Sequence, residues 1–243
     1  MGVSERFSLP IPFGWYCVAY SKDLAVGQVQ ALRYFGEELV LYRTASAKAV
    51  LTAAYCPHLG AHIGHGGRVD EEAIVCPFHG WKFTADGVVA EIPYAKQIPA
   101  KVAGKPCLRT YPVKELNGIV YAWYHPDQLK PSFEVAPFEE IESAEWTDYE
   151  TYQWDIKTHV QETGENAVDS AHFISVHDTF GLPTPTVEYD AHRRISQFRM
   201  QSAKYTNEGE CDVEDPMEGL VHTECSGVGQ TWTRQYTVAD VLI

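Results

Sequence analysis

The chain has 243 residues, of which 45% are hydrophobic and 21% are charged, and its formal net charge is −14. This length is enough for one large or two ordinary domains, and the composition is that of a soluble globular protein. The negative charge argues against a nucleic acid or an anionic membrane as partner, because both attract basic surfaces. There is no apolar signal segment near the start and no run of about eighteen apolar residues, so we expect neither export nor a membrane span.

Most of the predicted strands lie in the first half of the chain. Runs of β-branched and aromatic residues are separated there by glycine, proline and aspartate, and a hairpin is expected across residues 44–47. Strands are expected at residues 15–20, 38–43, 49–55, 74–75, 80–84 and 119–124 and, near the end of the chain, at 230–238. We therefore expect a small all-β domain over residues 12–127, with two loops projecting from one end.

Two short segments on those loops carry metal-binding residue types. They read C-P-H at 56–58 and C-P-F-H-G-W at 76–81. Two Cys and two His suit either a tetrahedral zinc site or a [2Fe–2S] cluster with both Cys on one iron and both His on the other. Zinc sites usually pair like with like, whereas each loop here supplies one residue of each type, as a loop that ligates both irons must. The candidate cluster ligands are Cys56, His58, Cys76 and His79.

Two alternatives to a cluster stay open, namely a structural zinc module and a pair of buried cysteines with solvated histidines. His62 and His65 lie between the ligand segments and are in principle ligands too, but their glycine-rich surroundings favour ordinary polar loop residues. The other cysteines show no paired spacing, so no disulfide framework is expected. Reduced thiols and an iron cluster both indicate the cytoplasm. The cysteines in question are Cys17, Cys107, Cys211 and Cys225.

A second group of polar residues lies in the second half of the chain. A linker rich in proline and glutamate follows residue 126, and residues 147–156 then alternate like a strand. Between residues 157 and 178 the pattern becomes helical, with Asn166, Asp169 and His172 near one face because they are three residues apart. The five-residue step to His177 turns about 140°, so the two imidazoles converge only if the helix bends or ends between them.

Two histidines and a carboxylate hold non-haem Fe(II) and leave positions open for O₂. His172 and His177 fit two of these three ligands. Asp169 lies one turn before His172, where a carboxylate fixes the tautomer of an imidazole. The same residue types on a helix are also common as plain surface groups.

The joint pattern resembles the Rieske non-haem iron ring-hydroxylating oxygenases. Their catalytic domain carries (N/E)-x-x-D-x-x-H-x-x-x-x-H, and this chain matches at Asn166, Asp169, His172 and His177. The resemblance covers nearly the whole chain. Within the family, the segments 79–81, 92–93 and 166–177 look most like the branch of the bacterial 3-ketosteroid 9α-hydroxylases and the cholesterol desaturases.

The resemblance implies an α+β fold, with an N-terminal Rieske β-sandwich over residues 12–127 and part of a helix-grip, START-like catalytic domain over 128–243. It implies a [2Fe–2S] cluster on the first domain and a mononuclear Fe(II) on the second. It also implies a head-to-tail homotrimer, in which the cluster of one chain lies beside the iron of the next and Asp169 links His172 to a cluster histidine, His58 or His79, of the neighbouring chain.

The activity implied by the resemblance is that of a terminal oxygenase. Such a component uses O₂ to hydroxylate or desaturate an apolar substrate, steroid-like or aromatic, as a monooxygenase or dioxygenase. The resemblance also implies that its electrons come from a separate ferredoxin or flavin reductase. This chain has no GxGxxG element that opens a helix, so we do not expect a built-in NAD or flavin module. The chain also lacks the extra Cys pair and the cluster-bonding Ser of respiratory Rieske proteins, so we expect a low reduction potential. Arg68 and Lys82 are candidates for a basic patch facing an acidic ferredoxin.

The family's third iron ligand, an Asp on a final helix, has no match in this sequence. The aspartates that follow His177 are Asp178, Asp190, Asp212, Asp215 and Asp240, and we expect all of them to be solvated carboxylates. We expect Asp190, Asp212 and Asp215 to lie in loops. We therefore expect a C-terminally truncated chain that still builds the cluster, and whose own oxygenase activity is in question. The alternative function is a Rieske-type electron carrier with a non-catalytic C-terminal half. Four aromatic residues suit either an apolar pocket or a packed core: Phe173, Phe180, Tyr189 and Phe198.

Overall fold

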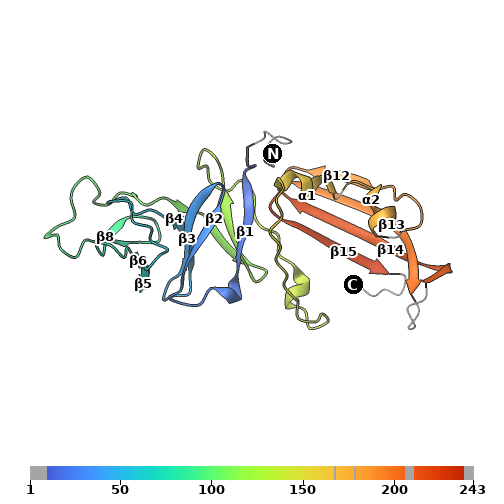
Figure 1. Ribbon diagram of the computed structural model, residues 1–243, viewed down its shortest axis with the longest axis horizontal. Helices are drawn as coiled ribbons and strands as arrows, with labels where there is room; N and C mark the ends of the chain where they lie inside the picture. The colour runs from blue at the N-terminus through green and yellow to red at the C-terminus, as the bar shows by residue number, and fades with distance from the viewer. Residues whose placement is uncertain (1–9, 167, 178, 206–210, 238–243) are drawn as a thin grey trace. The chain divides into compact units, whose positions relative to one another are not determined.

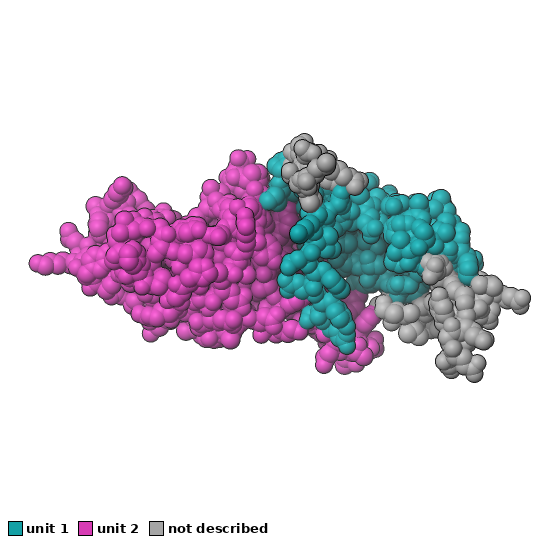
Figure 2. Space-filling view, viewed as in Figure 1, with its two compact units in different colours: residues 1–12, 150–243 teal, residues 13–149 magenta. Residues whose placement is uncertain are grey.

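The computed structural model describes residues 10–166, 168–177, 179–205 and 211–237. The chain divides into two compact units, one formed by Phe13–Tyr149 and the other mainly by Glu150–Ile243 (Figure 2). None of the described helices is long and apolar enough to cross a membrane.

The body of the first unit consists of two antiparallel sheets packed face to face. One has the order β1-β11-β10, with β1 at Gly14–Tyr20, β10 at Val113–Leu116 and β11 at Ile119–Tyr124. The other has the order β2-β3-β4-β9, with β2 at Val29–Tyr34, β3 at Glu37–Arg43, β4 at Ala49–Ala53 and β9 at Thr110–Tyr111. Buried side chains from both sheets form one core, as in a β-sandwich, and include Leu39, Leu41, Leu51 and Val120.

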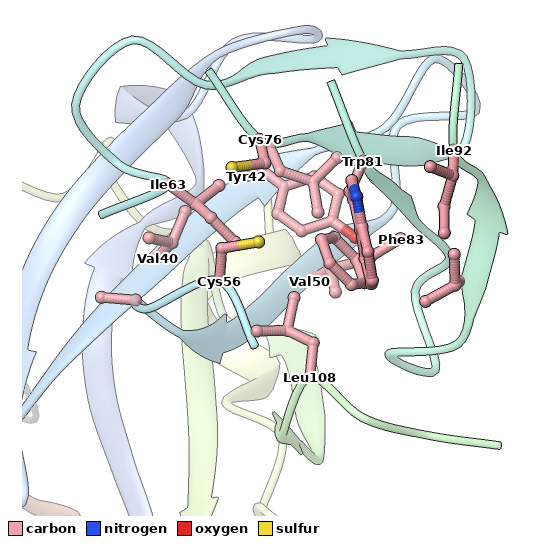
Figure 3. Close-up of a cluster of buried hydrophobic side chains, with 13 residues drawn as sticks. Val40, Tyr42, Val50, Cys56, Ile63, Cys76, Trp81, Phe83, Ile92 and Leu108 are labelled. Atoms are coloured by element: carbon pink, nitrogen blue, oxygen red, sulfur yellow. The ribbon is translucent and has the colours of Figure 1, made fainter. Parts of the chain in front are cut away.

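A third, smaller sheet carries the second ligand loop. Its order is β5-β6-β7-β8, with β5 at Arg68–Asp70, β6 at Ala73–Val75, β7 at Lys82–Phe83 and β8 at Val89–Glu91 (Figure 1). The first ligand loop follows β4, and the second connects β6 to β7. Both loops share a core with the neighbouring sheet, in which Cys56, Cys76 and Trp81 pack beside Tyr42 and Phe83 (Figure 3). The predicted strands of this half, including the hairpin across residues 44–47, are confirmed.

The segment after residue 126 belongs to the compact first unit, although its sequence indicated a linker. Val135 is buried with Trp15 and Trp123, and the Trp15 indole N–H donates to the Phe133 carbonyl at 2.8 Å. The segment also contains a short 3₁₀ helix, Glu139–Glu142. These apolar side chains attach the segment to the core of the first unit. They are spaced irregularly between prolines and glutamates, so the sequence shows neither a helical nor a strand periodicity that would predict this packing.

The strand predicted at residues 147–156 is wrong. No strand is assigned there, and Tyr152, Trp154 and Ile156 are 64%, 74% and 69% exposed. The alternation of polar and apolar residues is present, but strand assignment requires a hydrogen-bonded neighbour, and none of the described strands pairs with this segment.

The second unit combines one antiparallel sheet with two short helices. The sheet has the order β12-β13-β14-β15, with β12 at Thr186–Asp190, β13 at Arg193–Tyr205, β14 at Cys211–Ser226 and β15 at Thr231–Thr237. The helices are α1, Val160–Asn166, and α2, His172–Val176. They lie on one sheet face, where Phe173 packs edge-on against Phe198 and Arg194 donates to the Gly164 carbonyl at 2.7 Å (Figure 1). The α+β class and the final strand are confirmed.

Three of the aspartates do not lie in loops as predicted. Asp190 ends β12, and Asp212 and Asp215 lie within β14, because the polar residues near 211–217 belong to a long strand that pairs with β13. Asp178 and Asp240 lie outside the described residues.

Candidate metal centres

The two ligand loops have equivalent backbone geometry. In the first, the Cys56 N–H donates to the Ala61 carbonyl at 2.9 Å, and the Gly60 N–H donates to the Cys56 carbonyl at 2.9 Å. In the second, the Cys76 N–H donates to the Trp81 carbonyl at 2.9 Å, and the Gly80 N–H returns to the Cys76 carbonyl at 3.1 Å. Each loop therefore closes on its own cysteine, which fixes the direction of the side chains that follow it.

A glycine in the left-handed conformation closes each loop. Gly60 has φ +74° and Gly80 has φ +70°, a region that costs other residues about 1–2 kcal/mol. The Gly80 position is also crowded, since an added Cβ would lie 3.0 Å from the Pro93 ring, whereas the Gly60 position is open. The repeated Cys-Pro start and closing Gly were the sequence signal for this equivalence.

The two sulfur atoms lie in the interior. Cys56 and Cys76 are 3% and 2% exposed, and both side chains belong to the core shown in Figure 3. Burial raises the pKa of the Cys56 thiol to about 12, against the opposing effect of backbone N–H groups of His58 and Leu59 that donate to the sulfur. The Cys76 thiol lies within hydrogen-bonding reach of it. Two buried thiols side by side become thiolates only when a positive charge such as iron replaces their protons.

The two imidazoles lie nearer the surface. The rings of His58 and His79 are half-buried, with centroids 4.8 Å apart and planes at 74°. Trp81 stacks on His58 at 4.6 Å and 11°, and its indole N–H donates to the Tyr94 hydroxyl at 2.8 Å. Tyr94 was not among the residues singled out from the sequence, because it lies outside both ligand segments.

The donor set fits a [2Fe–2S] cluster better than a single zinc ion. Two thiols lie on the buried side and two imidazoles on the outer side, which gives each of two irons a pair of like ligands.

His62 and His65 form contacts of their own. Their rings stack at 4.2 Å, and the His62 Nε2 atom lies 3.8 Å from the Glu38 carboxylate. The Tyr55 hydroxyl donates to the same carboxylate. Burial lowers the pKa of His62, and the neighbouring His65 lowers it further. These contacts occur among the polar groups of the turn, and the expectation that neither histidine is a ligand stays a prediction.

The segment from Asn166 to His177 is not one continuous helix. Helix α1 ends at Asn166 and α2 begins at His172, so Asp169 lies in the break between them. Its carboxylate accepts the Ala171 N–H at 2.9 Å, and its second oxygen lies 3.6 Å from His172 Nδ1. Asn166 is exposed. Asp169 thus lies near His172 because of a local turn, and not because the two residues lie on the same face of one helix as predicted.

His172 and His177 lie close together across the end of α2. Their ring centroids are 5.4 Å apart, and the helix ends at Val176, so His177 adopts a non-helical conformation as its C-cap. The His172 side chain is only 15% exposed, and neither ring nitrogen has a hydrogen-bond partner in the described part of the chain. Leaving a buried polar group unpaired costs about 1–3 kcal/mol, which a bound metal would offset. The arrangement fits two ligands of an iron ion.

The matches to known families cover both units. Residues 14–112 match the family described as "Rieske [2Fe-2S] domain", and residues 122–241 match the "3-Ketosteroid 9alpha-hydroxylase C-terminal domain". The chain belongs to the Rieske oxygenases. The Rieske domain carries a [2Fe–2S] cluster, and the second match places the chain in the steroid-related branch of the family.

Curated relatives come from both animals and bacteria. The chain is 42% identical over 169 residues to "Cholesterol 7-desaturase nvd" of Xenopus laevis, which covers 68% of this chain and 36% of that protein. It is 36% identical over 174 residues to "Probable 3-ketosteroid-9-alpha-monooxygenase, oxygenase component" of Rhodococcus rhodochrous, covering 70% and 42%. The chain thus spans less than half of the length of these relatives.

Solved Rieske oxygenases share the fold. The crystal structure of dicamba monooxygenase bound to dicamba matches with a TM-score of 0.68 and 17% identity, over 93% of this chain and 67% of that one. Pseudomonas putida CBB5 NdmA matches with a TM-score of 0.60 and 20% identity, over 92% and 71%.

The basic patch predicted from Arg68 and Lys82 does not form. Lys82 Nζ lies 2.8 Å from the Asp70 carboxylate and 2.7 Å from the Glu91 carboxylate, and Arg68 lies 3.7 Å from Asp70. Two carboxylates thus offset the two cations locally. The strand pairing that brings them together is not apparent from their sequence separation.

Proposed function

We propose that this chain is the terminal oxygenase component of a Rieske non-haem iron oxygenase system. It uses O₂ and electrons from a ferredoxin or flavin reductase to hydroxylate or desaturate an apolar, steroid-like substrate. The observation that carries the proposal is the presence of two separate ligand sets in one chain. One is the Cys/His pair of loops, and the other is the buried His172 beside His177.

Each ligand set has a distinct role in the proposal. Four residues would hold the cluster, namely Cys56, His58, Cys76 and His79, and a bound cluster would supply one-electron transfer. The half-buried imidazoles are the ligands nearer the surface. His172 and His177 hold Fe(II), which supplies the centre for O₂ activation when it is bound. Asp169 lies 3.6 Å from His172 Nδ1, where its negative charge favours a proton on that nitrogen and would leave Nε2 for the metal. The low cluster potential expected from the sequence suits this direction of transfer.

The assembly is proposed to be a head-to-tail homotrimer. In it, Asp169 links its own His172 to His58 or His79 of the neighbouring chain, with Asn166 as a polar neighbour of this path. The support is that the Asp169 side chain is 56% exposed, so one side of the carboxylate is open to a second imidazole. The two functional domains are proposed as residues 12–127 and 128–243.

The substrate class rests on the relatives. Their names specify cholesterol desaturation and 3-ketosteroid monooxygenation, and both substrates are rigid and apolar. Phe173 and Phe198 pack together and serve the core, whereas Phe180 and Tyr189 are 41% and 77% exposed. A cytoplasmic location is proposed because the five cysteines whose side chains the structure describes are free thiols.

An electron carrier is the second candidate function. It is favoured by one observation, namely that only two ligands of the mononuclear iron lie together among the described residues. A chain with only those ligands would bind the second iron weakly and would transfer electrons without reacting with O₂ itself.

Iron content distinguishes the two functions. Anaerobic reconstitution of the purified chain should give about three Fe per chain for the oxygenase and about two for the carrier. The variant His172→Ala should lower the count by about one and leave the visible spectrum of the cluster unchanged. As a control, His125→Ala should leave both unchanged. A wild-type count of two that His172→Ala does not lower would exclude the oxygenase proposal for this chain.

A further inference from the structure

A lysine-rich arm lies beside the cluster loops. Residues 92–114 contain five Lys or Arg and no Asp or Glu, in a chain whose net charge is −14. Arg109 pairs with Glu37 and Lys114 with Glu134. The other three cations, Lys96, Lys101 and Lys105, are exposed and make no ion pair with any described residue. We call residues 94–106 the lysine arm.

The lysine arm is anchored on the cluster side of the first unit. Ala95, Ile98 and Val102 pack against the core that contains both ligand cysteines. A turn at Pro99 fixes the middle of the arm, since its carbonyl accepts the N–H groups of residues 102 and 103 at 2.9 and 3.0 Å. The apolar side chains thus point inward and the lysines outward. Figure 1 shows this stretch as the loop that follows β8.

The beginning of the arm touches the second ligand loop. Tyr94 accepts the Trp81 indole N–H at 2.8 Å, and its ring centroid lies 6.4 Å from that of His79. Pro93 lies against Gly80. Lys96 is therefore only two residues from Tyr94, whose ring neighbours that of the cluster ligand His79.

An exposed apolar centre accompanies these charges. Leu59 and Phe78 are next to the ligand histidines in sequence and are 66% and 63% exposed, and Tyr94 is 62% exposed. Protein interfaces combine an apolar centre with a charged rim that steers the partner. The half-buried His58 and His79 place the cluster edge close to this surface.

We propose that the lysine arm is the docking element for an acidic electron-donor protein. The inference rests on the proposed function and names the surface at which its electrons enter. The three unpaired ammonium groups attract a carboxylate-rich partner, while Leu59, Phe78 and Tyr94 contact it above the cluster. The lysine arm thus supplies the positive charge near the cluster that was predicted for Arg68 and Lys82, whose charges are offset by nearby carboxylates. The overall negative charge of the chain disfavours a partner that spreads along its whole surface.

Charge reversal at the arm tests the proposal. The triple variant Lys96→Glu/Lys101→Glu/Lys105→Glu is compared with Lys48→Glu/Lys130→Glu/Lys157→Glu, whose lysines are also exposed. Both triples change the net charge by the same amount, so only the position differs. The probe is a reduced, acidic plant-type [2Fe–2S] ferredoxin, and the rate of cluster reduction is followed by stopped-flow absorbance. Dithionite reduction of each variant shows that the cluster is intact and accessible.

At low ionic strength we expect the arm variant to be reduced by ferredoxin at least tenfold more slowly than wild type, and the control triple to change by less than about twofold. The difference should shrink as salt screens the charges. Equal slowing in both triples, or no slowing in the arm variant, would overturn the proposal. So would capture of wild type but not of the arm variant by phosphatidylserine vesicles, because the arm would then be a lipid site. Iron content tests the oxygenase function separately.

Discussion

The two metal centres differ in how firmly the chain itself builds them. The cluster loops connect sheet strands, close on their own cysteines through backbone hydrogen bonds and place both sulfurs in a core. The second centre lies on two short helices separated by a break, with an exposed Asp169 and two neighbouring imidazoles. The first is therefore preorganised before iron binds. The second retains two buried His172 ring nitrogens with no hydrogen-bond partner in the described part of the chain, a cost that a bound metal would offset.

Removing a cysteine of the first centre should have the largest effect. Cys76→Ser should abolish the cluster, because a hydroxyl does not replace a thiolate on iron in a buried site, and most of the first unit should lose stability with it. Visible absorbance and iron analysis measure the loss. Cys107→Ser changes a cysteine packed on the same core that is not a ligand, and it should retain the cluster. Equal cluster content in both variants would contradict the assignment.

The equivalence of the two loops predicts unequal costs at their closing glycines. Gly60→Ala should lower the free energy of unfolding by about 1 kcal/mol, from its left-handed conformation alone. Gly80→Ala carries the same cost and also crowds Pro93, so about 2 kcal/mol is expected. Urea unfolding of the two variants measures the difference. If Gly60→Ala proves the more damaging, the comparison of the loops is wrong.

At the second centre a substitution should stabilise the protein. In the chain stripped of mononuclear iron by a chelator, His172→Leu should raise the free energy of unfolding by about 1 kcal/mol, because it removes two buried nitrogens without partners. His177→Leu changes an exposed side chain and should stay within about 0.5 kcal/mol of wild type. Denaturant titrations decide the matter. A loss of stability in His172→Leu would show that the imidazole has a structural role.

The smallest effect is expected from the hydroxyl that anchors Trp81. Tyr94→Phe removes the acceptor of the Trp81 indole N–H and should cost about 0.5–1 kcal/mol. The EPR signal of the reduced cluster should shift slightly, since Trp81 stacks on His58. Tyr55→Phe, at a hydroxyl bonded to Glu38 away from Trp81, serves as the control and should leave the EPR signal unchanged. An identical signal in all three proteins would show that Trp81 does not orient His58.

The sequence by itself determined most of the strands of the first unit, and it predicted the four cluster ligands. Cys56, His58, Cys76 and His79 are recognisable because ligand chemistry depends on residue type, and loop closure depends on a nearby glycine. The hairpin of β3 and β4 follows equally from local alternation. All of these features depend on neighbours within a few residues in the sequence, so the pattern is visible without the fold.

Only the tertiary structure decided the features that depend on distant partners. Lys82 lost its predicted role because Asp70 and Glu91 reach it across neighbouring strands, while Lys96, Lys101 and Lys105 have no ion-pair partner among the described residues. Residues 147–156 alternate like a strand but have no described partner strand. Helices α1 and α2 contact the sheet through Arg194 and Phe198, which are about 25–30 residues away from their partners in the sequence. Charge pairing, strand pairing and packing are long-range interactions, and a local sequence pattern does not contain them.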